Sequence, residues 1–329
     1  MANALKINLT TSPVTYVNKT YAGLLAVPFV APAILSADSI ANGYISVLEN
    51  VRHKAVLKKF SGGAIAARTC DFQQPLLNTQ LILTDVVLTT AQLQVNEEFC
   101  NNQLAQDWAA AQMQGADAGM PNAYASFVSQ YVARITQAGV EEGIWAGNYS
   151  YDGGTATPTN TAFTGILAQY IAGAAQTNQG TTTGLWASDS ATAATDIMVH
   201  LATLTSKAPA SIAGDPDANI YMSRASAQLY YQGLADTYQL PFLNDGMVAR
   251  YAGYNILTPA GFPDNCAILS KKDNLYFGTN VLTDMTEARV LDLTAVTGSA
   301  VTRVVLLFDA GAQIVDEASM AVVRMSALV

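Results

Sequence analysis

The chain has 329 residues, of which 50% are hydrophobic and only 12% are charged, half of the roughly 25% charged residues that soluble domains usually carry. This composition excludes a mainly disordered chain, and the net charge of −9 excludes a general nucleic-acid binder, which needs a basic face against the phosphates. The cysteines, Cys70, Cys100 and Cys266, are widely spaced and odd in number. They predict buried free thiols, with neither a disulfide framework nor a zinc site.

The apolar stretch Leu24–Leu35 near the N-terminus predicts an extended arm. Lys6 and Lys19 stand among Asn and Thr, whereas a secretory signal places positive charge before an unbroken apolar core. The first apolar stretch, Leu24–Leu35, contains two prolines and is shorter than the ~20 residues that cross a bilayer. We therefore expect neither a targeting signal nor a membrane span.

Residues 44–90 predict strands, because four short apolar runs are separated by turn residues. The runs are Tyr44–Leu48, Ala55–Phe60, Ala64–Arg68 and Leu81–Leu88, and the turn Ser61–Gly63 between the second and third is typical of a hairpin. Five of the 16 basic residues fall here: Arg52, Lys54, Lys58, Lys59 and Arg68. A two-stranded ribbon with so many like charges is marginal alone in water, so we expect it to lie against acidic surface of this subunit or another.

Two helices are predicted next. The first spans Gln94–Gln114, where Val95, Phe99, Leu104, Trp108 and Ala111 recur near helical spacing. The second begins at Pro121, a favoured first helical residue, and runs to about Gly143. Its predicted apolar face is the stripe Tyr124, Phe127, Val128, Tyr131, Ile135 and Ala138.

The centre of the chain predicts an α/β or α+β layer. No Lys or Arg occurs between Arg134 and Lys207. A helix capped within Ser188–Ser190 has Ile197, Met198, Leu201 and Leu204 as its core face, and the strand Asn219–Met222 is followed by a helix that Ser223 caps.

The last third returns to strands, joined by turns at Thr297–Ser299 and Asp309–Gly311 that favour antiparallel pairing. The predicted strands are Cys266–Leu269, Leu275–Phe277, Arg289–Leu293, Val301–Phe308 and Met320–Met325.

Catalytic chemistry finds little support. His53 and His200 are the two histidines, and neither has a nucleophile or carboxylate nearby in sequence. The adjacent acidic pairs would point about 100° apart on a helix, so we interpret them as solvated or salt-bridged faces; they are Glu97–Glu98, Glu141–Glu142 and Asp316–Glu317. Asp215–Asn219 is interpreted as a turn because it lacks the Gly and Glu of a calcium loop. We expect no enzyme, catalytic residue, cofactor or metal.

Three groups of residues carry a family resemblance. They are Lys271–Thr279 with Val301–Phe308 and the final Ala-Val-Val-Arg at Arg324; Cys70–Phe72 with Val95–Cys100 and Asp107–Trp108; and Asn219–Ser223. Together with the order of elements, they resemble the major capsid proteins of tailed double-stranded DNA bacteriophages, and those of phages infecting Bacteroidetes and their relatives in particular.

The resemblance implies an α+β, Hong Kong 97-like capsid fold with four parts. Residues 1–40 would be the N-terminal arm and 41–90 the extended β-hairpin loop. Residues 91–147 and 271–329 would form the peripheral domain with its long spine helix, and 148–270 the axial domain.

The resemblance also implies a structural function. Copies would self-assemble into hexamers and pentamers of an icosahedral shell, built in the host cytoplasm, that encloses double-stranded DNA without reading its sequence. Portal protein, and scaffolding or decoration proteins, would be partners, and no membrane would be involved. The basic residues Arg52, Lys54, Lys58, Lys59 and Arg68 would be inter-subunit contacts. We expect no Lys–Asn cross-link through Lys58 or Lys59, and no cleaved N-terminal domain.

Other functions remain open beside this one. An encapsulin-type nanocompartment shell would have the same fold and would show an apolar groove for cargo. A tail-tube or surface-layer protein, and a soluble hydrolase, are further alternatives.

Overall fold

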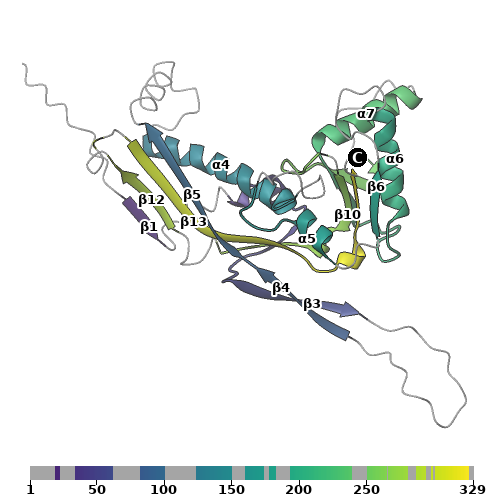
Figure 1. The fold of residues 1–329 in the computed structure, drawn as a ribbon, viewed down its shortest axis with the longest axis horizontal. Helices are drawn as coiled ribbons and strands as arrows, with labels where there is room; N and C mark the ends of the chain where they lie inside the picture. Colours follow the sequence, from purple (N-terminus) through teal and green to yellow (C-terminus); the bar gives the residue numbers. More distant parts are fainter. Residues whose placement is uncertain are drawn as a thin grey trace, which may run out of the picture.

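The computed structural model describes residues 19–22, 34–61, 82–100, 124–149, 160–173, 178–182, 193–238, 250–264, 266–280, 287–293, 298 and 301–325. Two sheets build an elongated body, and a separate two-stranded ribbon projects from it (Figure 1). A long helix runs along the first sheet, and two helices pack on the second. The mixed helix-and-sheet content agrees with the predicted α+β class.

The first sheet is organised around its longest strand. Its strands lie in the order β1 (Lys19–Ala22), β12 (Glu287–Asp292), β13 (Val301–Ile314), β11 (Leu275–Thr279) and β2 (Ser46–Leu48), and β5 (Ala91–Cys100) also pairs with β13. All these pairs are antiparallel except β11 with β2. Val304, Leu306 and Phe308 alternate into the core, as expected of a strand with one buried face.

Two sequence predictions fail in this sheet. Residues 94–100 are strand, not helix, because the half-buried Leu93, Val95 and Phe99 alternate with exposed polar residues at a period of two; residues 101–114 are not among those described. Asp309–Gly311 is not a turn but continues β13. Gly311 is needed there because a Cβ would lie 2.4 Å from the carbonyl oxygen of Thr89.

The second sheet matches its predictions more closely. Its order is β6 (Gln179–Thr182), β14 (Ala321–Met325), β10 (Cys266–Lys271), β7 (Ala218–Met222), β9 (Tyr254–Leu257) and β8 (Arg250–Tyr251). Helix α6 (Ala193–Ser206) buries Ile197, Leu201 and Leu204 completely, as predicted. Helix α7 (Arg224–Tyr238) is capped by Ser223, whose hydroxyl accepts the N–H of Ser226 at 3.1 Å.

Helix α4 (Tyr124–Ala146) forms where it was predicted but buries a different face. Tyr131, Ile135 and Ala138 of the predicted apolar face are exposed, whereas the core receives Val132, Thr136, Val140 and Ile144. The helix carries apolar residues on two faces. Thr136 can be buried because its hydroxyl donates to the carbonyl of Val132 at 2.9 Å.

The ribbon consists of β3 (Lys54–Ser61) and β4 (Ile82–Thr89), paired from Lys54↔Thr89 to Ser61↔Ile82. The strand that pairs with β3 therefore begins at Ile82, and not directly after the predicted turn Ser61–Gly63. The base of the ribbon is held against the first sheet: Val51 donates to the carbonyl of Thr279 at 3.1 Å, and Leu88 is completely buried.

The short elements join these parts. Helix α2 (Asp38–Ala41) and helix α5 (Ile166–Ala172) pack into the larger core, while η4 (Lys272–Asn274) and η5 (Glu317–Ser319) are single 3₁₀ turns. That core contains residues of both sheets, including Phe277 from the first and Tyr221 and Val322 from the second. Within the described residues, no helix is both long and apolar enough to span a membrane.

Candidate interaction surface

The β3–β4 ribbon carries exposed apolar side chains on one face, which we call the outer face of the ribbon. Cross-strand pairing brings Val56 beside Val87 and Phe60 beside Leu83. Phe60 is 66% exposed and Val56 is 55% exposed. Large apolar side chains gathered on a protruding ribbon are typical of a surface that another protein covers.

The basic residues of the ribbon fall into two groups. Lys58 pairs with Asp85 at 2.8 Å across the strands, and Lys59 pairs with Asp316 at 2.6 Å. Arg52 and Lys54 are exposed near the base, and Arg68 lies outside the described residues. The expected contact with acidic surface of the same subunit is therefore found between Lys59 and Asp316. Contact of these basic residues with another subunit stays a prediction.

Asp316 lies at the start of η5 and is held in a dense set of hydrogen bonds. Its carboxylate accepts from Lys59, from Ser319 and from the N–H of Ala318. Burial alone would raise the pKa of Asp316, but the hydrogen bonds from Lys59 and Ser319 outweigh it and hold the pKa below its ordinary value. The ion pair thus ties the ribbon to the end of β13.

The acidic pairs are only partly as predicted. Glu98 forms an ion pair with Arg303, and Asp316 pairs with Lys59, as salt-bridged faces would. Glu141 is different: it is buried, so its interpretation as a solvated or salt-bridged face is wrong. The reason is that α2 and the loop 258–264 cover this end of α4, which no periodicity in α4 itself reveals.

Glu141 is surrounded by hydrogen-bond donors. Its carboxylate accepts the backbone N–H of Ser39 at 3.0 Å and the Ser39 hydroxyl, and the Trp145 indole N–H lies 3.3 Å from Oε1. Burial raises the pKa of Glu141 and the nearby Asp38 adds to this, although these hydrogen bonds oppose the rise. These hydrogen bonds tie the carboxylate to α2 and to Trp145, so we assign it a structural role.

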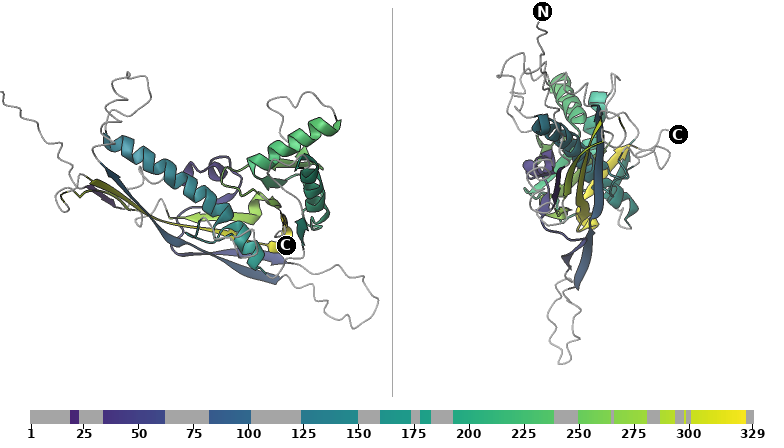
Figure 2. Two further views of the ribbon diagram at one scale, coloured as in Figure 1. Left: turned by 45° about the horizontal axis from the view of Figure 1, so that its top comes forward. Right: turned by 90° about the vertical axis from the view of Figure 1, so that its left-hand side faces the viewer.

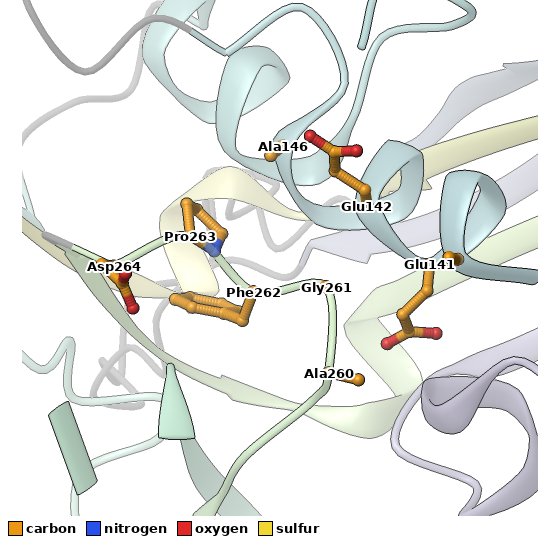
Figure 3. A pocket seen from close by; sticks show the side chains of 9 residues that line it. Glu141, Glu142, Ala146, Ala260, Gly261, Phe262, Pro263 and Asp264 are labelled. Atoms are coloured by element: carbon orange, nitrogen blue, oxygen red, sulfur yellow. The ribbon is translucent and has the colours of Figure 1, made fainter. Parts of the chain in front are cut away.

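A hollow of about 470 Å³ opens beside this network, between α4 and the loop 260–264. Figure 3 shows the carboxylates of Glu141 and Glu142 pointing in different directions, as expected for adjacent helical residues. Among the described residues, those that line the hollow include no histidine, cysteine, serine or lysine. Within the described ranges, no group of three His, Cys, Asp or Glu side chains could hold a metal ion.

Histidine and cysteine occupy structural positions. His200 is buried in α6, where burial lowers its pKa although Asp196 opposes the effect. His53 is at the base of the ribbon, where its carbonyl accepts the N–H of Thr90 at 3.0 Å. Cys266 is buried as predicted, whereas Cys100 is exposed at the end of β5, because it falls on the outward side of the alternation. Cys70 is not in the described part.

Sequence reasoning located the ribbon by its charge and missed its exposed apolar face. The signal was present, since Val56 and Phe60 are four residues apart and so share one face of a strand. It was obscured because Leu57 provides an apolar residue on the opposite face.

Similarity to known proteins is found at the level of structure. No protein-family model matches the chain, and no curated protein sequence matches it. A chain of the satellite phage P4 procapsid including size determination (Sid) protein aligns with a TM-score of 0.52 at 16% identity, covering 88% of this chain and 96% of that one. A chain of the capsid of the native GTA particle aligns with a TM-score of 0.50 at 14% identity, covering 90% of this chain and 90% of that chain.

A chain from Mycobacterium phage Bobi aligns with a TM-score of 0.52 at 11% identity, covering 99% of this chain and 96% of that chain. The aligned region thus includes nearly every element, among them the hairpin and the long helix. The resemblance inferred from the sequence is confirmed for the fold: this chain shares the fold of phage procapsid and capsid proteins.

Proposed function

We propose that this chain is the major capsid protein of a tailed double-stranded DNA bacteriophage, with a Hong Kong 97-like arrangement of arm, extended loop, peripheral domain and axial domain. One observation carries the proposal: the β3–β4 ribbon exposes Phe60, Val56, Leu83 and Val87 away from the body of a chain whose fold matches a procapsid protein over most of its length. A neighbouring copy would cover this apolar face in the shell.

The proposed parts keep the boundaries expected from the sequence. Residues 1–40 would be the arm, 41–90 the extended loop, 91–147 and 271–329 the peripheral domain, and 148–270 the axial domain. Strand pairing crosses this division, because β14 pairs with β10 and β6 of the second sheet. Strand β14 would thereby join the two domains, because its chain continues from the peripheral domain and its hydrogen bonds belong to the second sheet.

The assembly would consist of hexamers and pentamers in an icosahedral virion shell around the DNA, with portal protein and scaffolding or decoration proteins as further partners. The chain's net charge of −9 suits a container whose walls do not bind DNA tightly. Arg52, Lys54 and Arg68 would contact the neighbouring copy, and as exposed pairs each would contribute only ~0.2–1 kcal/mol. Repetition over many identical contacts makes such small terms sufficient.

Electron microscopy of the purified chain tests the proposal. Closed shells containing DNA support a capsid protein, and shells filled with protein cargo support an encapsulin. Tubes or flat arrays would indicate a tail or surface-layer protein, and a small uniform oligomer would indicate an enzyme.

A pair of matched variants tests the part played by the ribbon. Phe60→Ser should leave the thermal unfolding of the free subunit unchanged and abolish shells. Val199→Ser changes an apolar residue of α6 that is 56% exposed but far from the ribbon, and it should leave shells intact. Shells formed normally by Phe60→Ser would contradict the role of the ribbon.

A further inference from the structure

The C-terminal end of helix α4 lies in the middle of the body, where the two sheets share one core (Figure 1, Figure 2). Trp145 in this last turn packs its ring against Phe262 of the loop 258–264. Gly261 of the same loop lies so close to the helix that a Cβ would be 2.5 Å from the backbone of Glu141. The loop therefore packs directly on this end of α4.

Glu141 is the residue through which α2 is also attached to α4. Its side-chain oxygens accept the Ser39 backbone N–H at 3.0 Å and the Ser39 hydroxyl. The residue before Ser39 holds the loop, because the Asp38 carboxylate accepts the N–H of Ala260 at 3.1 Å. Helix α2, helix α4 and the loop 258–264 are thus joined around one buried carboxyl group.

The surroundings of this carboxyl group favour its neutral form. Glu141 is only 3% exposed, and among the described residues no cation is in ion-pair contact with it. The neighbouring charge that acts on it is a second carboxylate, Asp38. Tyr44 is also close enough to interact, and it stays neutral because burial, Asp38 and Glu141 all raise its pKa above 10.0. A buried carboxylate without a cation is costly, so this group takes up a proton more readily than an exposed one.

A route for the proton lies beside the network. The hollow of about 470 Å³ between α4 and the loop is lined by Glu141, and its other titratable groups are Glu142 and Asp264. Asp264 is exposed and Glu142 is half-buried, so solvent screens their charges. Figure 3 shows Glu142 pointing in a different direction from Glu141. A proton that leaves Glu141 can therefore pass to water in the hollow without unfolding of the core.

The hydrogen-bond geometry suits both protonation states. In the ionised state, the Ser39 hydroxyl donates to Oε1 of Glu141. In the neutral state, the Glu141 O–H can donate along the same line to the Ser39 oxygen, which also accepts the Trp145 indole N–H at 2.8 Å. Only the ionised state places an unpaired charge in the interior. Loss of the proton therefore weakens the closed arrangement relative to one in which water reaches the carboxylate.

We propose that Glu141 is a pH-sensitive switch: its protonated carboxyl group holds α2 and the loop 258–264 on α4, and loss of the proton lets these two segments open. The proton is released to water in the hollow, and no covalent bond of the chain changes. The switch belongs to the single subunit, so it does not depend on the proposed function.

Amide hydrogen exchange of the free subunit, followed by mass spectrometry on peptides covering 37–44 and 258–264, is the first test. Each rate is divided by the intrinsic rate of an unfolded peptide at the same pH, so that only the opening equilibrium remains. The raised pKa of Glu141 belongs to the closed state, so opening should be rarest below about pH 4.5 and increase as the pH rises above it. We expect a rise of about threefold or more between about pH 5 and about pH 8 in both peptides, and none in β10.

Three variants test whether Glu141 is the responsible group. Glu141→Gln cannot titrate, so the corrected exchange of both peptides should not change with pH. Glu142→Gln is the matched control, one residue further along the helix, and should keep the full rise. Asp38→Asn removes the neighbouring negative charge, so the pKa of Glu141 in the closed state should fall and the rise should be smaller.

A rise that persists in Glu141→Gln, or that is absent from the wild type, overturns the proposal. If Glu141→Gln does not fold, the contrast between Asp38→Asn and Glu142→Gln decides, and equal rises in these two variants overturn the proposal. Shell formation is a separate measurement, so failure of this inference leaves the capsid function standing.

Discussion

Ser39 in α2 donates two hydrogen bonds to Glu141 in α4, one from its backbone N–H at 3.0 Å and one from its hydroxyl, across 102 residues of sequence. The Trp145 indole N–H completes the network by donating to the Ser39 oxygen at 2.8 Å. The Trp145 ring also packs against Tyr221 and Phe262, with centroids 5.1 and 5.2 Å away. This network joins the long helix to α2 and to the second sheet, so it sets how the two halves of the subunit meet.

Replacing Glu141 should destabilise the subunit, and the loss of stability should be larger when the replacement removes more hydrogen-bond acceptors. Glu141→Ala leaves the buried Ser39 N–H without its acceptor and should lower the free energy of unfolding by about 1–3 kcal/mol. Glu141→Gln keeps an acceptor oxygen and should cost less than Glu141→Ala. Urea unfolding monitored by Trp fluorescence measures both. Equal stability of the wild type and Glu141→Ala would show that the network does not support the fold.

The buried carboxyl of Glu141 should also make the stability of the subunit depend on pH. Burial raises the pKa of Glu141 above its ordinary value of 4.5 in the folded state. Its contribution to stability is therefore complete below about pH 4.5 and is lost as the pH rises through the raised folded value. Glutamine does not titrate, so the stability of wild type relative to Glu141→Gln should fall as the pH rises above about 4.5. A difference that does not change as the pH rises would contradict the prediction.

Lys59 and Lys58 form a matched pair for testing how the ribbon is held. Lys59→Met removes a partly buried ion pair with Asp316 and should speed amide hydrogen exchange in β3 and β4. Lys58→Met removes an exposed pair with Asp85, worth at most ~1 kcal/mol, and should change exchange little. Because hydrogen bonds hold the pKa of Asp316 low, the contribution of its pair persists down to that pKa and is lost as the pH falls through it. Equal exchange in both variants would contradict a special role for Lys59.

Gly261 and Gly139 should respond in opposite directions to alanine. A Cβ at Gly261 would lie 2.5 Å from backbone atoms of Glu141 and Glu142, so Gly261→Ala should force the loop off α4 at a cost of about 1–3 kcal/mol. Gly139 is helical with open space around it, so Gly139→Ala should stabilise the subunit by up to ~1 kcal/mol. Differential scanning calorimetry of the two variants measures the contrast. A stabilising Gly261→Ala would show that the loop does not pack closely on the helix.

The N-cap of α7 offers a local test. Ser223→Ala removes the oxygen that accepts the Ser226 N–H and should cost about 1 kcal/mol. Ser206→Ala, at an exposed serine in the last turn of α6, should change stability by less than ~0.5 kcal/mol. Chemical denaturation of both variants provides the comparison, and equal losses would contradict the capping role.

Local sequence was sufficient where one element carries its own signal. Helix α6 has one apolar stripe and buried it as expected, and the step from β7 through Ser223 into α7 follows from a strand, a cap and a helical pattern. Helix α4 shows the opposite case. It has apolar residues on two faces, so its periodicity predicted a helix correctly but could not indicate which face the sheet would cover.

The sequence alone determined the class of fold, the existence of the hairpin, most of the strands and the resemblance to phage capsid proteins. These depend on short-range patterns of apolar, polar and turn residues, which the chain carries locally. Only the tertiary structure decided that Glu141 is buried with Ser39, that β3 pairs with residues 82–89, and that Tyr131, Ile135 and Phe60 remain at the surface. Each of these depends on which distant segment packs against a residue, and that is a property of the assembled fold.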